Sequence, residues 1–352
     1  ILQEADVFGW FTHDNELVSQ ICIYPCEVNI HSRIFRMGGV TGVGTYPEFA
    51  GMGLMNDLIR LALQKMRKAE QYVSYLYPYS IPYYRRKGWE IMSDHITFTL
   101  KDTEIPETVE VPGHVERLPV GDEDVKGTYD RFARCTHGAL IRNDFEWMEY
   151  WRWENEEERT AAVYYDAKDI PQGFLLYWVE EDVFHIREMV YLTQEARKGL
   201  WNFIRAHYSM IDAVKGHIYT GEPLAFLLDE SQIQETIEPY FMARIVDVAQ
   251  FLRLYPFEGS IRPFHFVVTD PMAEWNNGIF SVATDREGTV SVTDEPAGKA
   301  VELDIQTLSA MLMGYKRPSY LARIERLHTD KRTLRLLEEI IPDGQPYFSD
   351  YF

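Results

Sequence analysis

The chain has 352 residues with 35 basic and 55 acidic side chains, and its formal charge of −20 argues against a nucleic-acid partner, because such an excess repels a phosphate backbone. The same charge favours cationic small molecules, although carboxylates in this number also serve solubility. A hydrophobic content of 46% with 14% aromatic residues excludes a disordered chain, and the length suits two or three domains.

The first part of the chain opens with two strand-like runs, Val7 to Phe11 and Leu17 to Tyr24. A third run, Gly39 to Thr45, leads through a turn with Gly51-Met52-Gly53 into an amphipathic helical pattern. The apolar residues of that pattern fall on one face: Leu54, Leu58, Leu61, Ala62 and Met66. Strand, glycine-bearing turn and helix is the order that points backbone N–H groups and a helix N-terminus at an anion.

Two other phosphate-binding motifs fit this turn poorly. A Rossmann fingerprint needs a third glycine, which is missing here. A Walker A loop needs Gly-Lys-Ser/Thr, and none follows. Because an isolated Gly-x-Gly pair is often a simple turn, the motif by itself leaves both a phosphate cradle and a plain turn open.

The helix is followed by a strand run from Tyr72 to Tyr77, a turn at Pro78 and the segment Ser-Ile-Pro-Tyr-Tyr-Arg-Arg-Lys-Gly-Trp at 80–89. Alternation in His95 to Leu100 predicts a strand that closes the first domain, residues 1–101. A polar linker with proline runs from Lys101 to Gly113.

The middle segment, residues 114–245, repeats the element order of the first. It begins with a strand at 115–118 and a helix at 122–136, continues with strands at 161–166, 173–179 and 183–191, and then has a helix-rich run at 194–210. Lys198-Gly199-Leu200-Trp201 offers no Gly-x-Gly turn. We therefore expect a degenerate copy that serves structure and assembly.

The third segment, residues 246–352, mixes strands and helices. Phe264 to Val268 alternates as a strand, and Trp275-Asn276-Asn277-Gly278 is a hairpin-turn signal. Further strands are expected at 278–284 and 289–293, and helices at 304–312 and 331–340.

The chain has three cysteines, Cys22, Cys26 and Cys135. An odd number without framework spacing or a histidine cluster predicts reduced thiols in a cytosol-like compartment and no metal site. The sequence contains neither a run of 18 apolar residues nor a signal-peptide pattern. We therefore expect a cytoplasmic protein with no membrane partner.

The first segment resembles the acetyl-CoA-binding core of the GNAT acyltransferases, in which an Arg/Gln-x-x-Gly-x-Gly/Ala turn holds the CoA pyrophosphate. Gly51 and Gly53 match its glycines, whereas Glu48 and Ala50 remove positive charge found there in the family. Tyr-Arg-Arg-x-Gly-Trp, ending at Trp89, resembles the Eis (enhanced intracellular survival) branch. Four further blocks resemble the same branch: His137–Asn143, Glu195–Phe203, Phe241–Val248 and Ser349–Phe352.

The resemblance implies an α/β (α+β) fold of two tandem GNAT folds, the second degenerate, followed by a sterol-carrier-protein-like α+β domain at 246–352. It also implies a homo-oligomer, often a hexamer. A GNAT fold normally has a strand and one or two helices before this point. Because the chain opens at Ile1 without methionine, we expect an N-terminal segment to be missing.

The resemblance assigns acetyl-CoA as co-substrate, without a metal. The strand residues Val43, Gly44 and Thr45 are expected to pair with pantetheine and to polarise the acetyl oxygen, as in an oxyanion hole. Gly51, Met52 and Gly53 are expected to hold the pyrophosphate through N–H groups. Ser80 is expected either to cap the short helix that follows or to contact CoA.

Two catalytic groups follow from the same resemblance. Tyr84 matches the tyrosine that the family uses as general acid, and a phenol with a pKa near 10 stays protonated at neutral pH. The general base is the terminal carboxylate, carried here by Phe352. Its ordinary pKa of roughly 3.5 would rise on burial beside aromatic rings. The aromatic ending of the chain, Tyr347-Phe348-Ser349-Asp350-Tyr351-Phe352, favours a docked tail, although the aromatics could instead only pack the C-terminus.

The function implied is an N-acetyltransferase that acts on a cationic amine (an aminoglycoside, a polyamine or a lysine side chain) by direct attack in a ternary complex. The alternative is a non-catalytic carrier of an apolar ligand with a vestigial GNAT core. Retention of the glycine turn, Tyr84 and a terminal carboxylate favours the enzyme.

Overall fold

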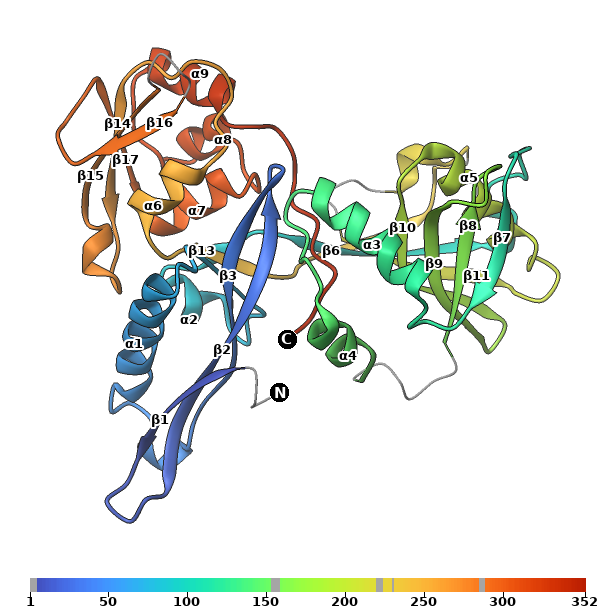
Figure 1. Ribbon diagram of the computed structural model, residues 1–352, viewed down its shortest axis with the longest axis horizontal. Helices are drawn as coiled ribbons and strands as arrows, with labels where there is room; N and C mark the ends of the chain where they lie inside the picture. The colour runs from blue at the N-terminus through green and yellow to red at the C-terminus, as the bar shows by residue number, and fades with distance from the viewer. Residues whose placement is uncertain (1–4, 153–158, 220–223, 230, 285–288) are drawn as a thin grey trace. The chain divides into compact units, whose positions relative to one another are not determined.

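The computed structural model describes residues 5–152, 159–219, 224–229, 231–284 and 289–352, so Ile1, where the first domain was expected to begin, lies outside the described residues. The chain folds into two compact units. The first unit contains residues 1–93, 240–346 and 351–352, and the second contains residues 94–239 and 347–350. Each unit is described by itself below, with the element labels of Figure 1.

A six-stranded sheet forms the centre of the first unit. Its order is β1 (Asp6–Phe11), β2 (Leu17–Ile30), β3 (Arg33–Thr45), β4 (Val73–Leu76), β13 (Met242–Ile245) and β5 (Glu90–Ile91). The strands β1, β2 and β3 form an antiparallel meander. β3 and β4 run parallel, which requires a crossover connection.

Helix α1 (Leu54–Lys68) supplies that crossover and covers one face of the sheet (Figure 1). Its apolar stripe is buried at Leu58, Ile59, Ala62, Leu63 and Met66, close to the stripe expected from the sequence. Two short helices, η1 (Pro47–Phe49) and α2 (Ile81–Arg85), flank α1 along the chain. The predicted strand, turn, helix and strand at 39–77 are therefore confirmed.

Two boundary strands lie in sheets other than those expected. β6 (Asp94–Lys101), expected to close the first domain, pairs with β11 (Ala213–Ile218) and β12 (Gln234–Pro239) in the second unit. β13, expected in the middle segment, lies in the first unit between β4 and β5. Local alternation predicts that a segment is a strand, but its partner is selected by non-local packing, which a single sequence does not reveal.

The second unit has a seven-stranded sheet of order β12, β6, β11, β10 (Val183–Tyr191), β9 (Pro171–Glu180), β8 (Thr160–Tyr165) and β7 (His114–Leu118). Its helices are α3 (Glu123–Cys135), α4 (Asp144–Arg152) and α5 (Gln194–Arg205), with short turns η2 (Asp102–Glu104) and η3 (Ala225–Leu227). The expected helix at 122–136 and the four expected strands are confirmed within two residues, whereas the helix-rich run ends earlier, at Arg205.

The C-terminal part of the first unit holds a four-stranded sheet of order β16 (Val290–Thr293), β15 (Gly278–Thr284), β14 (Phe264–Thr269) and β17 (Lys299–Asp304). Helices α6 (Val248–Leu254), α7 (Ile305–Leu312), α8 (Pro318–Arg323) and α9 (Lys331–Ile340) accompany it. β14 and β15 are antiparallel neighbours, but the expected tight hairpin is replaced by a longer connection containing η4 (Glu274–Asn276), which the Asp270 carboxylate organises by accepting two backbone N–H groups.

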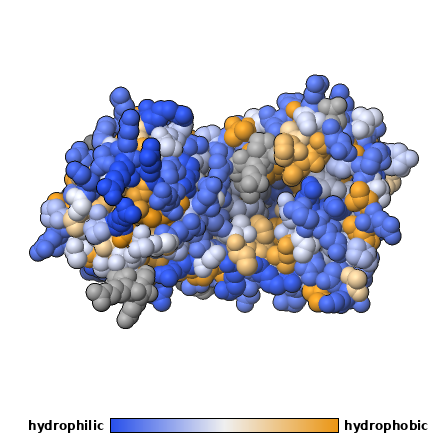
Figure 2. Space-filling model, turned by 90° about the horizontal axis from the view of Figure 1, so that it is seen from above, coloured by the Kyte–Doolittle hydropathy of each residue, from blue (hydrophilic) through white to orange (hydrophobic). Residues whose placement is uncertain are grey.

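Cys22, Cys26 and Cys135 form no disulfide within the described residues. No helix among the described residues is long and apolar enough to cross a bilayer. Figure 2 shows a surface that is mostly hydrophilic, with apolar side chains in separate small patches.

Candidate active site

The strands β3 and β4 part in the middle of the first sheet. They pair from Met37 and Val73 up to Val40 and Leu76, where β4 ends. β3 continues to Thr45, paired on its other edge with β2. Within the described chain, no strand covers the edge of β3 from Thr41 onward. The result is an open strand edge, which can pair with an extended ligand.

A bulge changes the direction of β3 at this opening. The register between β2 and β3 shifts between Gln20 and Cys22, opposite Gly42, whose φ of +57° suits glycine. Beyond it lie Val43, Gly44 and Thr45, the residues expected to hold pantetheine. Gly44 and Thr45 line a hollow of about 280 Å³ at the ends of β2 and β3.

The glycine turn leaves a row of backbone donors unused. Gly51 and Gly53 have φ of +80° and +83°, and Gly53 is the N-cap of α1 without any capping side chain. The N–H groups of residues 51–55 donate to no acceptor within the described chain. A Cβ atom at either glycine would meet nothing within 4 Å. These residues therefore fit a bound diphosphate by conformation and by donors.

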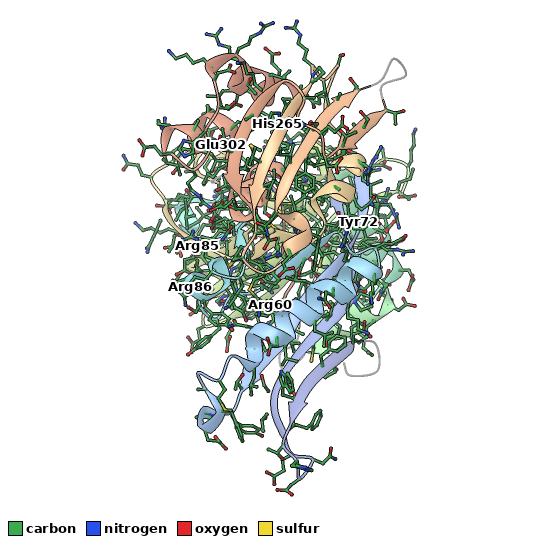
Figure 3. All side chains as sticks on the ribbon, turned by 90° about the vertical axis from the view of Figure 1, so that its left-hand side faces the viewer. Arg60, Tyr72, Arg85, Arg86, His265 and Glu302 are labelled. Carbon is green, nitrogen blue, oxygen red and sulfur yellow. The ribbon has the colours of Figure 1, made fainter. Side chains whose placement is uncertain are left out.

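Positive charge near this turn comes from residues that the motif does not contain. Lys87 donates to Asn56 in the first turn of α1. Burial, and then Arg86 and Arg60, lower the pKa of Lys87 below its usual value. Figure 3 shows Arg60 on α1 with Arg86 nearby. The glycine-turn motif does not contain these cations, which lie near a turn that lacks basic residues at 48 and 50.

Tyr84 lies in the last turn of the short helix α2. The backbone carbonyl of Ser80 accepts hydrogen bonds from the N–H groups of Tyr83 and Tyr84, but the Ser80 side chain makes no capping bond. Tyr84 is buried, and burial together with Tyr83 raises the pKa of its hydroxyl to about 12. No hydrogen bond joins that hydroxyl to the rest of the described chain, so it keeps its proton at neutral pH and can donate it.

The end of the Tyr-Arg-Arg-x-Gly-Trp motif is held by a buried arginine far along the sequence. Arg244 donates to the carbonyl of Lys87 and pairs with Asp270, and both of these charged side chains are fully buried. Gly88 has φ of +96°, and a Cβ atom there would collide with the Arg244 guanidinium. This collision explains why the motif has glycine, and no larger residue, at position 88.

The two arginines of the motif differ in their surroundings. Arg85 forms an ion pair with the buried Glu90 at 2.8 Å, so it holds the local fold. Arg86 is exposed and has no ion-pair partner in the described chain. Arg86 is therefore the arginine available to a phosphate.

The terminal residue of the chain lies against β3. A Cβ atom placed on Gly39 would be 2.8 Å from Cε2 of Phe352. The Phe352 ring also contacts Phe241 edge-on, with ring centroids 5.2 Å apart, and Tyr24 at 6.4 Å. Tyr351 packs on Tyr77, which follows the end of β4. The tail therefore ends among aromatic rings, beside the point where β3 and β4 separate.

Tyr84 and Phe352 approach the sheet from opposite faces. Gly38 faces Met66 of α1, and its neighbour Gly39 faces Phe352, because successive strand residues point to opposite sides. Tyr84 packs in the apolar cluster on the α1 side, with Leu58 among its members. The free edge of β3 begins where β3 and β4 separate. Both faces of the sheet adjoin this edge.

Two parallel strands also separate in the second unit. β10 and β11 pair up to Ile186 and Gly216, next to a register shift between Ile186 and Glu188. Helix α5 is capped by the Thr193 side chain, which accepts from the N–H of Ala196. In contrast to α1, this helix therefore has a capping side chain that takes up one of its first N–H groups.

Rings gather on β6 and β11 beside this opening, which keeps a cavity of about 190 Å³ lined in part by Ile186, His217 and Tyr219. His95 and His217 are joined by a hydrogen bond of 2.7 Å, and His95 stacks on Tyr219 with centroids 5.2 Å apart. Burial, and then His95 and Arg187, lower the pKa of His217 to about 3.

A GNAT-type fold is defined by three features seen here: a parallel strand pair that separates, a bulge in one of its strands and a glycine turn at the start of a helix. Comparison with known proteins agrees. Family models match residues 1–92 and 138–245, both described as acetyltransferase (GNAT) domain, and residues 248–349, described as sterol carrier protein domain.

Solved structures and sequence relatives give the same assignment. A conserved protein of unknown function from Enterococcus faecalis, described as a probable N-acyltransferase, is 30% identical, with a TM-score of 0.91 over 100% of this chain and 90% of that one. A GCN5-related N-acetyltransferase from Anabaena variabilis is 25% identical, with a TM-score of 0.87 over 98% and 89%. N-acetyltransferase Eis of Mycobacterium tuberculosis is 24% identical over 233 residues, 63% of this chain and 55% of that protein.

The chain therefore belongs to the GNAT family, among the Eis-like proteins that carry two GNAT domains and a sterol-carrier domain. The expected fold class is confirmed. GNAT acetyltransferases use acetyl-CoA. The chain spans about half the length of the Eis relatives that it matches.

Proposed function

We propose that this protein is an acetyl-CoA-dependent N-acetyltransferase whose acceptor is a cationic amine. The observation that carries the proposal is the contact of Phe352 with Gly39, because it brings the end of the chain to the strand whose free edge would hold the thioester. Family membership and the unused donors at residues 51–55 support it independently.

The residues that would hold the co-substrate are those of the open edge and the turn. The backbone of Val43, Gly44 and Thr45 would pair with the pantetheine arm and polarise the acetyl oxygen. The N–H groups of Gly51, Met52 and Gly53, with Arg86 and Lys87 nearby, would meet the diphosphate. Ser80 remains a candidate CoA contact, because its side chain is not used as a cap. When bound, acetyl-CoA supplies the activated acetyl group.

The protein's own groups would manage the protons. The terminal carboxylate of Phe352 would take a proton from the attacking ammonium, and the Tyr84 hydroxyl would give one to the leaving thiolate. Direct attack of the amine nitrogen forms the new C–N bond as the C–S bond breaks, so no acyl-enzyme is needed. A raised pKa at Tyr84 fits a group that must stay protonated until the thiolate leaves.

The acceptor is inferred from charge. With 55 acidic and 35 basic residues, the protein attracts cations over distance, and an aminoglycoside, a polyamine or a lysine side chain is a cation that carries the required amine.

The carrier alternative finds less support in the C-terminal domain. A cavity of about 710 Å³ there has a mixed lining. Its charged residues are Arg262, Lys299, Asp330, Arg332, Arg335 and Glu339, and its apolar ones include Pro263, Phe264 and Leu336. An apolar ligand that lay against the charged side chains would displace their water, which weakens the carrier alternative.

The test is release of CoA thiol from acetyl-CoA against a panel of amines, with protein that ends at Phe352. We expect turnover with polybasic amines, and loss of turnover when one glycine is added after Phe352, since the carboxylate then moves about 3.8 Å along the chain. Stabilisation by CoA should survive the extension. Full turnover by the extended protein would remove the terminal carboxylate from the mechanism, and the absence of any response to CoA would favour a carrier.

A further inference from the structure

The tail of the chain is bound before it reaches Phe352, and it is bound by the second unit. Residues 347–350 belong to that unit, whereas residues 351–352 belong to the first. Tyr347, Phe348, Ser349 and Asp350 are all at least 95% buried, which is unusual for the end of a chain. A buried tail segment with polar residues requires specific partners.

Tyr347 lies across the parted strands of the second unit. Its hydroxyl donates to Glu188 on β10 at 2.8 Å, and its ring lies 6.1 Å from that of Tyr219, just beyond β11. Its backbone N–H donates to the carbonyl of His137 at 2.8 Å. The first tail residue thus contacts both sides of the opening that, in the first unit, leaves the strand edge free.

A buried ionic network holds the next part of the tail. Glu188, whose side chain is fully buried, also accepts from the Ser349 hydroxyl at 2.5 Å. The Arg142 guanidinium binds two carboxylates. Its Nη2 lies 3.1 Å from Oε1 of Glu188, and its Nε donates to Oδ1 of Asp350 at 2.7 Å. Arg142 is itself fully buried. Charge-assisted hydrogen bonds of this kind fix geometry as well as energy.

Aromatic rings hold the guanidinium in place. Arg142 lies 3.7 Å from the centroid of Tyr129 and 4.8 Å from that of Trp147. The Tyr129 hydroxyl is 3.2 Å from the second oxygen of Asp350. Both oxygens of the Asp350 carboxylate are therefore engaged, so the residue two positions before the terminal carboxylate has one orientation.

We propose that the vestigial cleft of the second GNAT unit is a binding site for the C-terminal peptide of this chain, and that Arg142 is a positioning residue for the terminal carboxylate. The proposal rests on the proposed function, because the carboxylate has to act as base for its position to matter. The block His137–Asn143 then has a function in binding the tail. Its His137 carbonyl accepts from the Tyr347 N–H, and its Arg142 guanidinium donates to Asp350. The second unit then has a role as the binding site of the tail.

The test is Asp350→Ala in the full chain, with Asp350→Asn as the conservative variant. Arg142 keeps Glu188 as a partner in both, so the core of the second unit retains a paired charge. Loss of one charge-assisted hydrogen bond weakens docking roughly tenfold to a hundredfold. We expect kcat to fall by about tenfold or more in Asp350→Ala and less in Asp350→Asn, with the KM for acetyl-CoA unchanged. Asp343→Ala, at a side chain that is 93% exposed, is the matched control.

Two readouts separate positioning from general stabilisation. Hydrogen exchange of the amides at 347–352 should accelerate in Asp350→Ala while exchange in β8 to β10 is unchanged. A variant that combines Asp350→Ala with one added C-terminal glycine should turn over no more slowly than the glycine extension alone, because both changes act through the same carboxylate.

The outcomes distinguish the two proposals. Parental kcat in Asp350→Ala, with turnover abolished by the glycine extension, overturns the positioning role and leaves the base intact. Parental turnover in the glycine extension overturns the base and, with it, the positioning role. Unchanged exchange at 347–352 in Asp350→Ala overturns the binding site itself.

Discussion

Replacing Gly39 by alanine tests whether the position of the terminal residue controls turnover. A Cβ atom on Gly39 would lie 2.8, 3.0 and 3.3 Å from three ring carbons of Phe352. Carbon atoms in contact prefer about 3.5–4.0 Å, so the ring has to retreat by about 1 Å. The backbone cannot yield as easily, because Gly39 is paired with Tyr24 on β2 and with Tyr75 on β4. The displacement therefore falls on Phe352 and on the carboxylate that it carries.

A shift of about 1 Å in a catalytic group costs about a hundredfold in rate, so we expect kcat of Gly39→Ala to fall by that order. The KM for acetyl-CoA should change little, since Gly39 lies before the open edge of β3. The assay is thiol release at saturating amine, with CoA-induced stabilisation as the check on the cofactor site.

Gly127→Ala is the matched control for this substitution. It makes the same change in α3, where an added Cβ meets nothing within 4 Å, and a helical alanine is favoured over glycine by about 1 kcal/mol. We expect parental turnover from it. A folded Gly39→Ala protein that also turns over at the parental rate would refute the placement of the terminal carboxylate at β3.

Three further predictions concern other parts of the site and the fold. Tyr84→Phe should lower kcat by about 10²-fold or more with little loss of stability, because the hydroxyl has no partner in the described chain, whereas Tyr83→Phe should turn over normally in the same assay. Gly53→Ala should cost about 1–2 kcal/mol in thermal unfolding, because its φ of +83° strains any side chain, and CoA titration should show weaker binding. His217 has a folded pKa of about 3 against about 6.5 in an unfolded chain, so between these values only the unfolded chain takes the proton. Stability should therefore fall with decreasing pH, by about 2 kcal/mol at pH 5, and His217→Phe should lessen that fall; an equal fall in both proteins would contradict it.

Local sequence patterns predicted most elements of this fold correctly. The amphipathic stripe of α1, the helix start at Asp122 and the strand at 183–191 each follow from periodicity or capping over a few residues. The same patterns could not show which sheet β6 and β13 join, since alternation in a strand is the same whichever sheet it joins.

The candidate site was predictable only where a motif is continuous in sequence. Gly51 and Gly53 have positive φ in the structure, and Tyr84 is buried with a raised pKa, in keeping with the motifs that named them. Arg244 could not be found in this way, because it meets Gly88 and Lys87 from a strand about 150 residues away. Lys87 and Arg60 could not be identified for a similar reason, since they come together only when the segment after α2 folds against α1.

The sequence by itself determined the turn that offers free N–H groups, the helix that follows it and the aromatic character of the last residues, because each depends on neighbours along the chain. Tertiary structure alone decided that β3 and β4 part at Val40 and Leu76, and that the ring of Phe352 rests on Gly39. It also decided that Arg142 and Asp350, 208 residues apart, share one buried ion pair. Such contacts form only when folding removes charges and rings from water and brings distant segments together, and that cooperative step has no local signature.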